Sequence, residues 1–165
     1  MYSPTPDQQR GIEWLSPRNF GCLVMDTGTG KTGVALSVLK AWHNVQRTIA
    51  LVPRQVVKNW PKECINWDVP GVVVACRGTQ AQRLKLIKSN WNLLVINHDA
   101  IRTPAVLDAL LDAHADFLIV DEVHNFKTRT AARTKAAVKL RAHRAYEALR
   151  GALGEAAGDF EAPER

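Results

Sequence analysis

The chain has 165 residues, of which 46% are hydrophobic and 23% are charged, and 22 Lys and Arg residues outnumber 16 Asp and Glu residues to give a net charge of +6. This length is enough for one domain with a substantial core, and the composition excludes wholesale disorder. The longest apolar runs, of about four residues, are far below the roughly 20 that a membrane span needs, so no membrane partner is expected.

The cysteines and the opening residues indicate a reducing, cytoplasmic location. Three widely separated cysteines without a Cys-x-x-Cys pair argue against a disulfide framework and against a structural zinc site. Polar residues follow the first four positions, so no signal peptide is expected. The basic balance permits a nucleic-acid partner without proving one, and residues 127–144 contain seven Lys and Arg residues and no acid.

Short apolar runs alternate with amphipathic segments along the chain. The apolar runs predict strands that are buried on both faces, at residues 22–25, 48–52, 72–75, 93–97 and 117–121. Helical spacing of apolar residues predicts helices at residues 31–43, 55–66, 79–89 and 103–114, and a basic, Ala-rich helix at about 130–158. This alternation is typical of an α/β domain with a mostly parallel sheet flanked by helices.

A Gly-rich loop between the first predicted strand and helix has the composition of a phosphate-binding loop. Gly28 and Gly30 allow the backbone amides to turn inward around a phosphate, and the helix that follows adds the positive end of its dipole. Lys31 supplies a point charge for the β- and γ-phosphates, although Met25 stands where the full consensus has glycine. The candidate nucleotide ligands are Thr27, Gly28, Thr29, Gly30, Lys31 and Thr32.

Two adjacent carboxylates end the last predicted strand, at the edge where α/β sheets place their ligands. Asp121 is expected to hold Mg²⁺ together with the hydroxyl of Thr32, and Glu122 is expected to act as the general base for the attacking water. With Lys31 these residues form the candidate catalytic set of an ATPase that uses ATP and Mg²⁺.

The acidic residues are part of a sequence, Asp121-Glu122-Val123-His124, that resembles the Asp-Glu-x-His box of superfamily 2 helicases. Residues 6–15 resemble the Pro-x-Gln-x-x-Gly-hydrophobic-x-Trp-Leu segment of Swi/Snf-type DNA translocases, and residues 51–63 resemble their motif Ia. Residues 95–102 stand in the place of motif Ib, with His98 where the family usually has Tyr.

The resemblance implies roles for further residues. Gln8 would read the adenine edge, and His124 would couple the nucleotide site to other motifs. The implied contacts with duplex DNA, which would not be sequence-specific, are at Arg54, Lys58, Asn97, His98 and Lys127.

The resemblance also implies a fold and a domain organisation. Residues 1–144 would form the first, ATP-binding RecA-like lobe of the motor, and residues 145–165 would form a partly disordered, Ala-rich tail outside the family pattern. Motors of this type need a second lobe, whose arginines stabilise the transition state, and its absence typically costs on the order of a thousandfold in turnover. The isolated chain is therefore expected to be a truncated lobe that hydrolyses ATP slowly.

Two functions remain open. In the first, the chain is the ATP-binding lobe of a DNA helicase or translocase that moves on DNA when a second lobe is present, for instance on another polypeptide. In the second, it is a catalytically weak module that binds nucleotide and DNA without motor activity. A third class, a small-molecule kinase, explains neither the segment around Gln8 nor the acidic box that contains His124.

Overall fold

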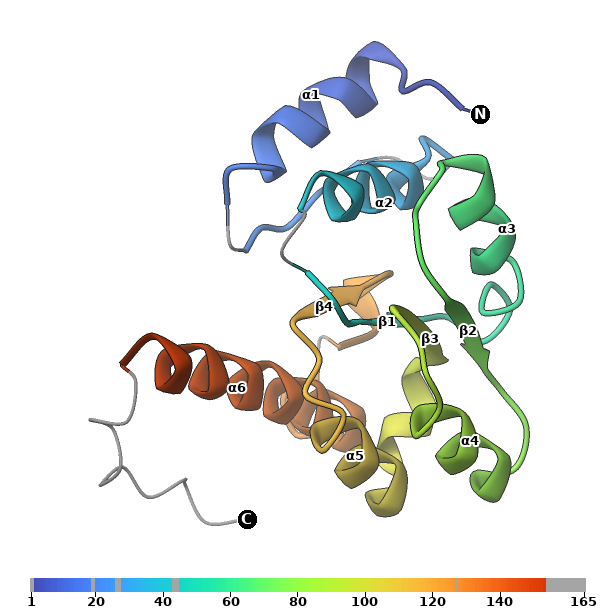
Figure 1. Ribbon diagram of the computed structural model, residues 1–165, viewed down its shortest axis with the longest axis vertical. Coiled ribbons are helices and arrows are strands. Elements are labelled where there is room, and N and C mark those ends of the chain that lie inside the picture. Colours follow the sequence, from blue (N-terminus) through green and yellow to red (C-terminus); the bar gives the residue numbers. More distant parts are fainter. Residues whose placement is uncertain (1, 19, 26–27, 43–44, 127, 154–165) are drawn as a thin grey trace.

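A four-stranded parallel sheet forms the centre of the molecule (Figure 1). The computed structural model describes residues 2–18, 20–25, 28–42, 45–126 and 128–153, and for residues 144–153 it describes the backbone alone. The sheet order is β2-β3-β1-β4, so β2 and β4 are its edge strands. The strands are β1 (Thr48–Val52), β2 (Val73–Cys76), β3 (Leu93–Asn97) and β4 (Phe117–Val120).

The register places the carboxyl ends of the strands at one level. Leu51 of β1 pairs with Ile96 of β3 and with Val120 of β4, and Ile96 also pairs with Cys76 of β2. The residues that follow these strands therefore share one edge of the sheet, which we call the carboxyl edge. Asp121 follows β4 at this edge.

Two layers of helices cover the sheet, one on each face (Figure 1). Alternate residues of β1 divide between two cores, with Ala50 and Val52 in one and Ile49 and Leu51 in the other. The first layer contains α2 (Lys31–Ala41) and α3 (Trp60–Asn66), and α1 (Pro6–Leu15) packs on α2. The second contains α4 (Gln80–Ile87), α5 (Pro104–Leu111), α6 (Ala132–Leu153) and the 3₁₀ turn η1 (His98–Arg102).

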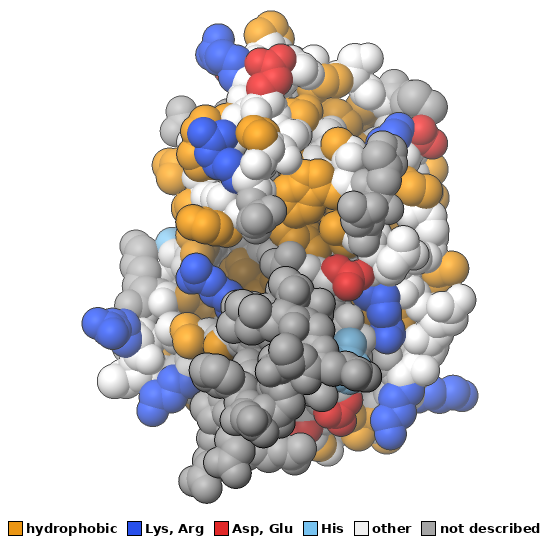
Figure 2. Space-filling view, turned by 60° about the vertical axis from the view of Figure 1, so that its left-hand side comes forward, with side chains coloured by type: hydrophobic (Ala, Val, Ile, Leu, Met, Phe, Trp, Pro, Cys, Tyr) orange, Lys and Arg blue, Asp and Glu red, His pale blue; other side chains and the backbone are white. Residues whose placement is uncertain are grey.

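The predicted α/β class is confirmed, but the strand predicted at residues 22–25 is wrong. Residues 20–25 form no strand, because neither edge of the sheet pairs with them. Leu23 instead lies against Gly11 of α1, which Val34 of α2 also approaches, and Val24 is 89% exposed. Apolar side chains gather in the upper part of Figure 2, the height at which α1 and α2 lie in Figure 1.

Helix boundaries differ from the predictions where local chemistry sets them. Residues 55–59 form turns, and α3 begins only at Trp60, because Pro61 has no amide hydrogen and can stand only in the first turn of a helix. Helix α1 was not predicted, yet Thr5 and Gln8 form its capping box. No helix in the described part of the chain is long and apolar enough to cross a membrane.

Helix α6 runs through the domain boundary predicted at residues 144 and 145. The backbone is helical from Ala132 to Leu153, so no structural break marks that boundary within the described residues. Residues 154–165, which include most of the predicted tail, lie outside the described residues.

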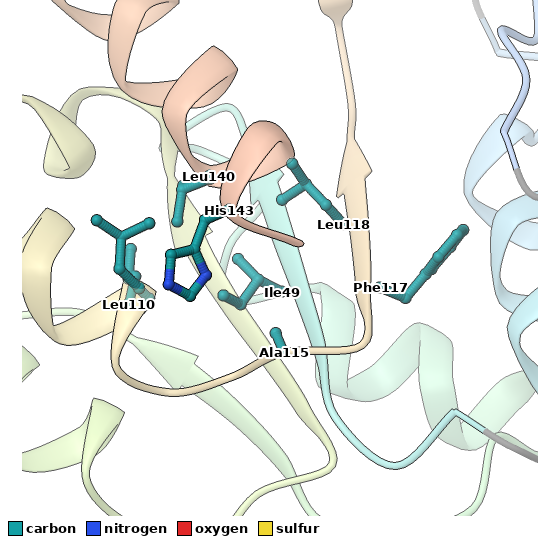
Figure 3. A pocket seen from close by; sticks show the side chains of 8 residues that line it. Ile49, Leu110, Ala115, Phe117, Leu118, Leu140 and His143 are labelled. Atoms are coloured by element: carbon teal, nitrogen blue, oxygen red, sulfur yellow. The ribbon is translucent and has the colours of Figure 1, made fainter. Parts of the chain in front are cut away.

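A small crevice lies where α5 and α6 meet the sheet. Figure 3 shows the ring of His143 from α6 between Leu110 and Ile49, with Leu140 next to it. The crevice measures about 20 Å³, which is room for about one water molecule. It is therefore a packing defect of the second core and is too small for a substrate.

Gly33 allows α2 and α3 to approach one another. A Cβ atom at Gly33 would lie 2.2 Å from Cζ2 of Trp67, whose ring packs against the core between the sheet and the first helical layer and against Tyr2. Alanine normally stabilises a helix interior relative to glycine. We expect Gly33→Ala to reverse that sign and to lower the free energy of unfolding by about 1–3 kcal/mol, because the indole must move. Urea denaturation followed by circular dichroism measures the free energy of unfolding. Ser37→Ala in the same helix is the control. Equal stability of Gly33→Ala and the parent would contradict this packing.

Candidate nucleotide site

The phosphate loop turns through two left-handed glycines into α2. Gly28 has a φ of 83° and Gly30 a φ of 76°, a region that residues with a side chain rarely occupy. Gly30 caps α2, so the first amides of the helix point toward the loop. The Nζ of Lys31 donates a hydrogen bond of 3.0 Å to the carbonyl of Met25, which holds the ammonium group over the loop.

Helix α1 is joined to this loop by Gln8, which is only 8% exposed. Its Oε1 accepts the amide of Thr5 at 2.8 Å, and its Nε2 donates to the carbonyl of Thr29 at 3.0 Å. A Cβ atom at Gly30 would lie 2.2 Å from this Nε2, so glycine permits the contact. These two bonds leave the Gln8 carboxamide one N–H and one oxygen lone pair for an adenine edge. The adenine contact predicted for Gln8 stays a prediction.

The acidic pair lies at the carboxyl edge, as predicted for the end of β4. The amide of Asp121 donates to the carbonyl of Leu51 at 2.9 Å, which fixes the residue beside β1. Its Oδ1 accepts the amide of Glu122 at 2.9 Å. Glu122 has a φ of 52°, which is in the left-handed region. The backbone therefore turns at Glu122, and its side chain does not continue the direction of β4.

Lys31 of the phosphate loop lies within electrostatic reach of Asp121. Burial raises the pKa of the Asp121 carboxyl above its ordinary value of 3.8, and the carboxylate of Glu122 adds to the rise. The amide of Glu122, the His98 ring and the ammonium of Lys31 oppose it. Lys31 and Asp121 are 90 positions apart in sequence (121 minus 31), so the fold itself brings cation and carboxylate within electrostatic reach.

Glu122 is oriented by its neighbours in η2 (Val123–Phe126). The Nδ1 of His124 lies 3.0 Å from Oε2 of Glu122. Both the amide and the side chain of Asn125 donate to the backbone carbonyl of Glu122. His124, for which a coupling role was predicted, thus touches the residue predicted as the general base.

His98 joins β1, β3 and β4 from inside the sheet edge. It is 5% exposed, and its Nε2 lies 3.2 Å from the carbonyl of Leu51 and 2.9 Å from that of Asp121. Because both partners are acceptors, the Nε2 carries the proton. The ring also packs edge-on against Phe126 at 4.9 Å.

The burial of His98 contradicts the DNA contact that was predicted for it. His98 cannot offer its ring to a backbone phosphate while the ring is buried and bonded to two carbonyls, and Asn97 is only 8% exposed. Arg54 and Lys58 are exposed in the turns after β1, where a contact remains open to them. Thr27 and Lys127 lie outside the described residues.

The donor set suits a magnesium ion. Thr32 offers a hydroxyl in the first turn of α2, and Asp121 offers a carboxylate within electrostatic reach of Lys31. Mg²⁺ prefers oxygen ligands, and it binds through one or two protein groups with waters and substrate phosphates. The residues predicted for the ion therefore fit it in chemistry.

The sequence interpretation missed two positioning residues, Thr5 and His98. Thr5 caps α1, and Thr-Pro-Asp-Gln at residues 5–8 is a capping-box signal that could have revealed it. His98 was identified in sequence, but as a surface contact. Nothing in the sequence near position 98 points to the carbonyls of Leu51 and Asp121, because the three strands meet only in the sheet.

Comparison with known proteins decides the family. Residues 2–148 match the family described as "Type III restriction enzyme, res subunit". The chain belongs to this family. Together with Swi/Snf-like relatives, the match confirms the resemblance to the first RecA-like lobe of superfamily 2 helicases and translocases.

The relatives are much longer than this chain. It is 29% identical to the mouse (Mus musculus) "DNA annealing helicase and endonuclease ZRANB3" over 137 residues, 79% of this chain and 12% of that protein. It is 25% identical to the zebrafish (Danio rerio) "DNA excision repair protein ERCC-6-like", covering 83% of this chain and 10% of that protein. It is 22% identical to the yeast (Saccharomyces cerevisiae) "ISWI chromatin-remodeling complex ATPase ISW2", covering 76% of this chain and 12% of that protein. The chain thus spans about a tenth of the length of these relatives.

The buried His98 predicts a pH dependence of stability. Burial lowers its pKa below 6.5, so below that pH the unfolded chain takes up a proton that the folded chain does not. The free energy of unfolding should therefore fall as pH drops below 6.5, by at most about 1.4 kcal/mol per pH unit from this group. Urea titrations at pH 7.5 and 5.5 should show a smaller fall in His98→Gln, whose amide can still donate. His124→Gln is the matched control, and an unchanged pH dependence in His98→Gln would contradict the assignment.

The buried carboxylate of Asp121 predicts a cost in stability. Because its pKa is raised in the fold, ionised Asp121 destabilises the protein at neutral pH, and the cost disappears as pH falls through the raised pKa toward 3.8. Asp121→Asn should raise the thermal midpoint at pH 7 and abolish magnesium-dependent nucleotide binding. Glu63→Gln, which removes a carboxylate from α3, is the comparison, and differential scanning calorimetry measures the midpoints. A lower midpoint for Asp121→Asn than for the parent would contradict the prediction.

Proposed function

We propose that the chain is the ATP-binding lobe of a DNA helicase or translocase that hydrolyses ATP to move on DNA when a second lobe is present. The observation that carries the proposal is that Lys31, at the start of α2, lies within electrostatic reach of Asp121, which follows β4 and whose Oδ1 accepts the amide of Glu122. A cation beside a turn of inward amides and a pair of acids are the parts that phosphoryl transfer from ATP requires.

Each residue has a distinct task in this proposal. Gly28 and Gly30 shape the loop whose amides receive the phosphates, and Lys31 moves from the carbonyl of Met25 to the β- and γ-phosphates. Thr32 and Asp121 would hold Mg²⁺, and the ion would supply positive charge to the phosphates. Glu122, oriented by His124, takes the proton of the attacking water.

The DNA partner is proposed from the relatives and from the surface. Mouse ZRANB3 is a DNA annealing helicase by name, and the zebrafish relative is a DNA excision repair protein by name. Arg54 and Lys58 are exposed after β1, on the carboxyl edge that also holds the acidic pair. A nucleic-acid backbone at this edge would therefore lie next to the nucleotide site.

Nucleotide binding is the direct test. We expect Lys31→Ala to weaken the binding of a fluorescent ATP analogue in the presence of Mg²⁺ by about tenfold or more, since a hydrogen bond to a charged group is worth about 1.5–3 kcal/mol. Lys40→Ala removes the same charge from the opposite end of α2 and is the matched control. Equal affinities of Lys31→Ala and the control would overturn the proposal.

A turnover assay separates the motor lobe from a binding module. The proposal expects phosphate release that is slow for the chain alone and that rises when duplex DNA and a protein carrying a second lobe are added. Nucleotide binding without any such rise would favour the module that binds nucleotide and DNA without motor activity.

A further inference from the structure

The peptide group between Asp121 and Glu122 is held from both sides. Its carbonyl oxygen lies 2.9 Å from Nε2 of His98, and its N–H donates to Oδ1 of Asp121 at 2.9 Å. The described residues contain no cis peptide, so this C=O and this N–H point in nearly opposite directions. The imidazole and the carboxylate therefore lie at opposite ends of one planar group.

The orientation of this peptide group connects His98 to both acids. Because the group is planar, any rotation that moves its carbonyl also moves its N–H. If the carbonyl turns away from His98, the N–H turns away from Oδ1 of Asp121, and the φ of Glu122 changes with it. The direction of the Asp121 carboxylate and the turn at Glu122 thus depend on one hydrogen bond from the imidazole.

His98 is itself fixed in place, so it can impose this orientation. The ring is 5% exposed and packs edge-on against Phe126 at 4.9 Å. Its Nε2 also lies 3.2 Å from the carbonyl of Leu51, and the amide of Asp121 donates to that same carbonyl at 2.9 Å. Leu51 and His98 together therefore hold the peptide groups on both sides of Asp121.

The backbone of Glu122 needs such support. Its φ of 52° is left-handed, and a residue with a side chain keeps that conformation only where its surroundings fix it. Asn125 donates to the carbonyl of Glu122 from its amide at 2.9 Å and from its side chain at 3.2 Å. His98 holds the peptide group before Glu122, so this residue is fixed on both sides.

We propose that His98 is a positioning residue for the acidic pair, whose Nε2–H fixes the Asp121–Glu122 peptide and thereby holds the Asp121 carboxylate ready for Mg²⁺. The proposal rests on the proposed function, because it takes Asp121 as a ligand of the ion. Loss of a group that orients a metal ligand typically lowers metal affinity by about 10–100-fold. His98 thus has a task inside the protein in place of the DNA contact predicted for it.

The test replaces His98 by side chains that differ in their ability to donate. His98→Phe keeps a flat ring and removes the N–H. His98→Gln keeps an N–H near the position of Nε2, and His98→Asn keeps an amide that is one carbon shorter. Val106→Ala is the control for a loss of stability, because Val106 of α5 is buried in the same core and has no polar side-chain atom.

Each variant is titrated with a fluorescent ATP analogue, once in Mg²⁺ and once in EDTA, and circular dichroism verifies that it folds. The ratio of the two affinities measures the contribution of the ion. We expect His98→Phe and His98→Asn to lower this ratio by about tenfold or more, and His98→Gln to stay within about threefold of the parent. Affinity in EDTA should not change, because the phosphate loop is intact. Val106→Ala should lower the thermal midpoint and leave the ratio unchanged.

Three results would overturn the positioning role. These are a ratio in His98→Phe equal to that of the parent, an equal fall in Val106→Ala, and a ratio in His98→Gln as low as that in His98→Phe, which would assign the loss to the shape of the ring. If His98→Phe does not fold, the two amide variants decide, and equal ratios in His98→Gln and His98→Asn overturn the role.

The parent separates this proposal from the proposed function. A parent that binds the analogue no more tightly in Mg²⁺ than in EDTA refutes the magnesium site of the proposed function, and the role of His98 with it. A parent with a clear gain from Mg²⁺, together with an unchanged gain in His98→Phe, refutes the role of His98 alone.

Discussion

The hydrogen bonds of His98 hold the carboxyl edge of the sheet together. One Nε2–H lies between the carbonyls of Leu51 and Asp121, so a residue that follows β3 fixes the ends of β1 and β4 at once. The acidic pair begins at one of those carbonyls, and the turn that carries Arg54 begins just past the other. The proposed nucleotide site and the proposed DNA contacts therefore depend on one buried imidazole.

Phe126 and Asp99 extend this connection to the second helical layer. The ring of His98 packs on Phe126 at the end of η2, while the next residue, Asp99, lies 3.7 Å from a guanidinium nitrogen of Arg133 in α6 and 3.8 Å from one of Arg102. A displacement of η1 would be transmitted to η2, where His124 contacts Glu122. The geometry thus provides a physical route between the segment after β3 and the acidic pair.

The sequence predicted the elements whose signals are local and failed where a distant neighbour decides. Strands 48–52 and 93–97 were predicted at their exact bounds, because both are buried on both faces and read as continuous apolar runs. The run at 22–25 has the same composition but no adjacent strand, and composition carries no information about pairing. Similarly, the pattern around Gly28, Gly30 and Lys31 predicted the loop, whereas the bond from Gln8 to Thr29 required α1 to be in place.

The burial of Asp121 lowers the free energy of unfolding at neutral pH, because an ionised carboxylate is less stable in the fold than in water. The fold raises the pKa of a carboxyl that the proposed chemistry needs in its ionised form, and it opposes that rise with the Glu122 amide, His98 and Lys31. Each of these groups comes from a different segment, so only the complete fold brings together the groups that limit the cost of burying the carboxylate. A bound divalent cation would add to the same opposition, since it favours the charged carboxylate. A bound cation should therefore stabilise the folded protein at this residue, because the cation lowers the energy of a charge that burial raises.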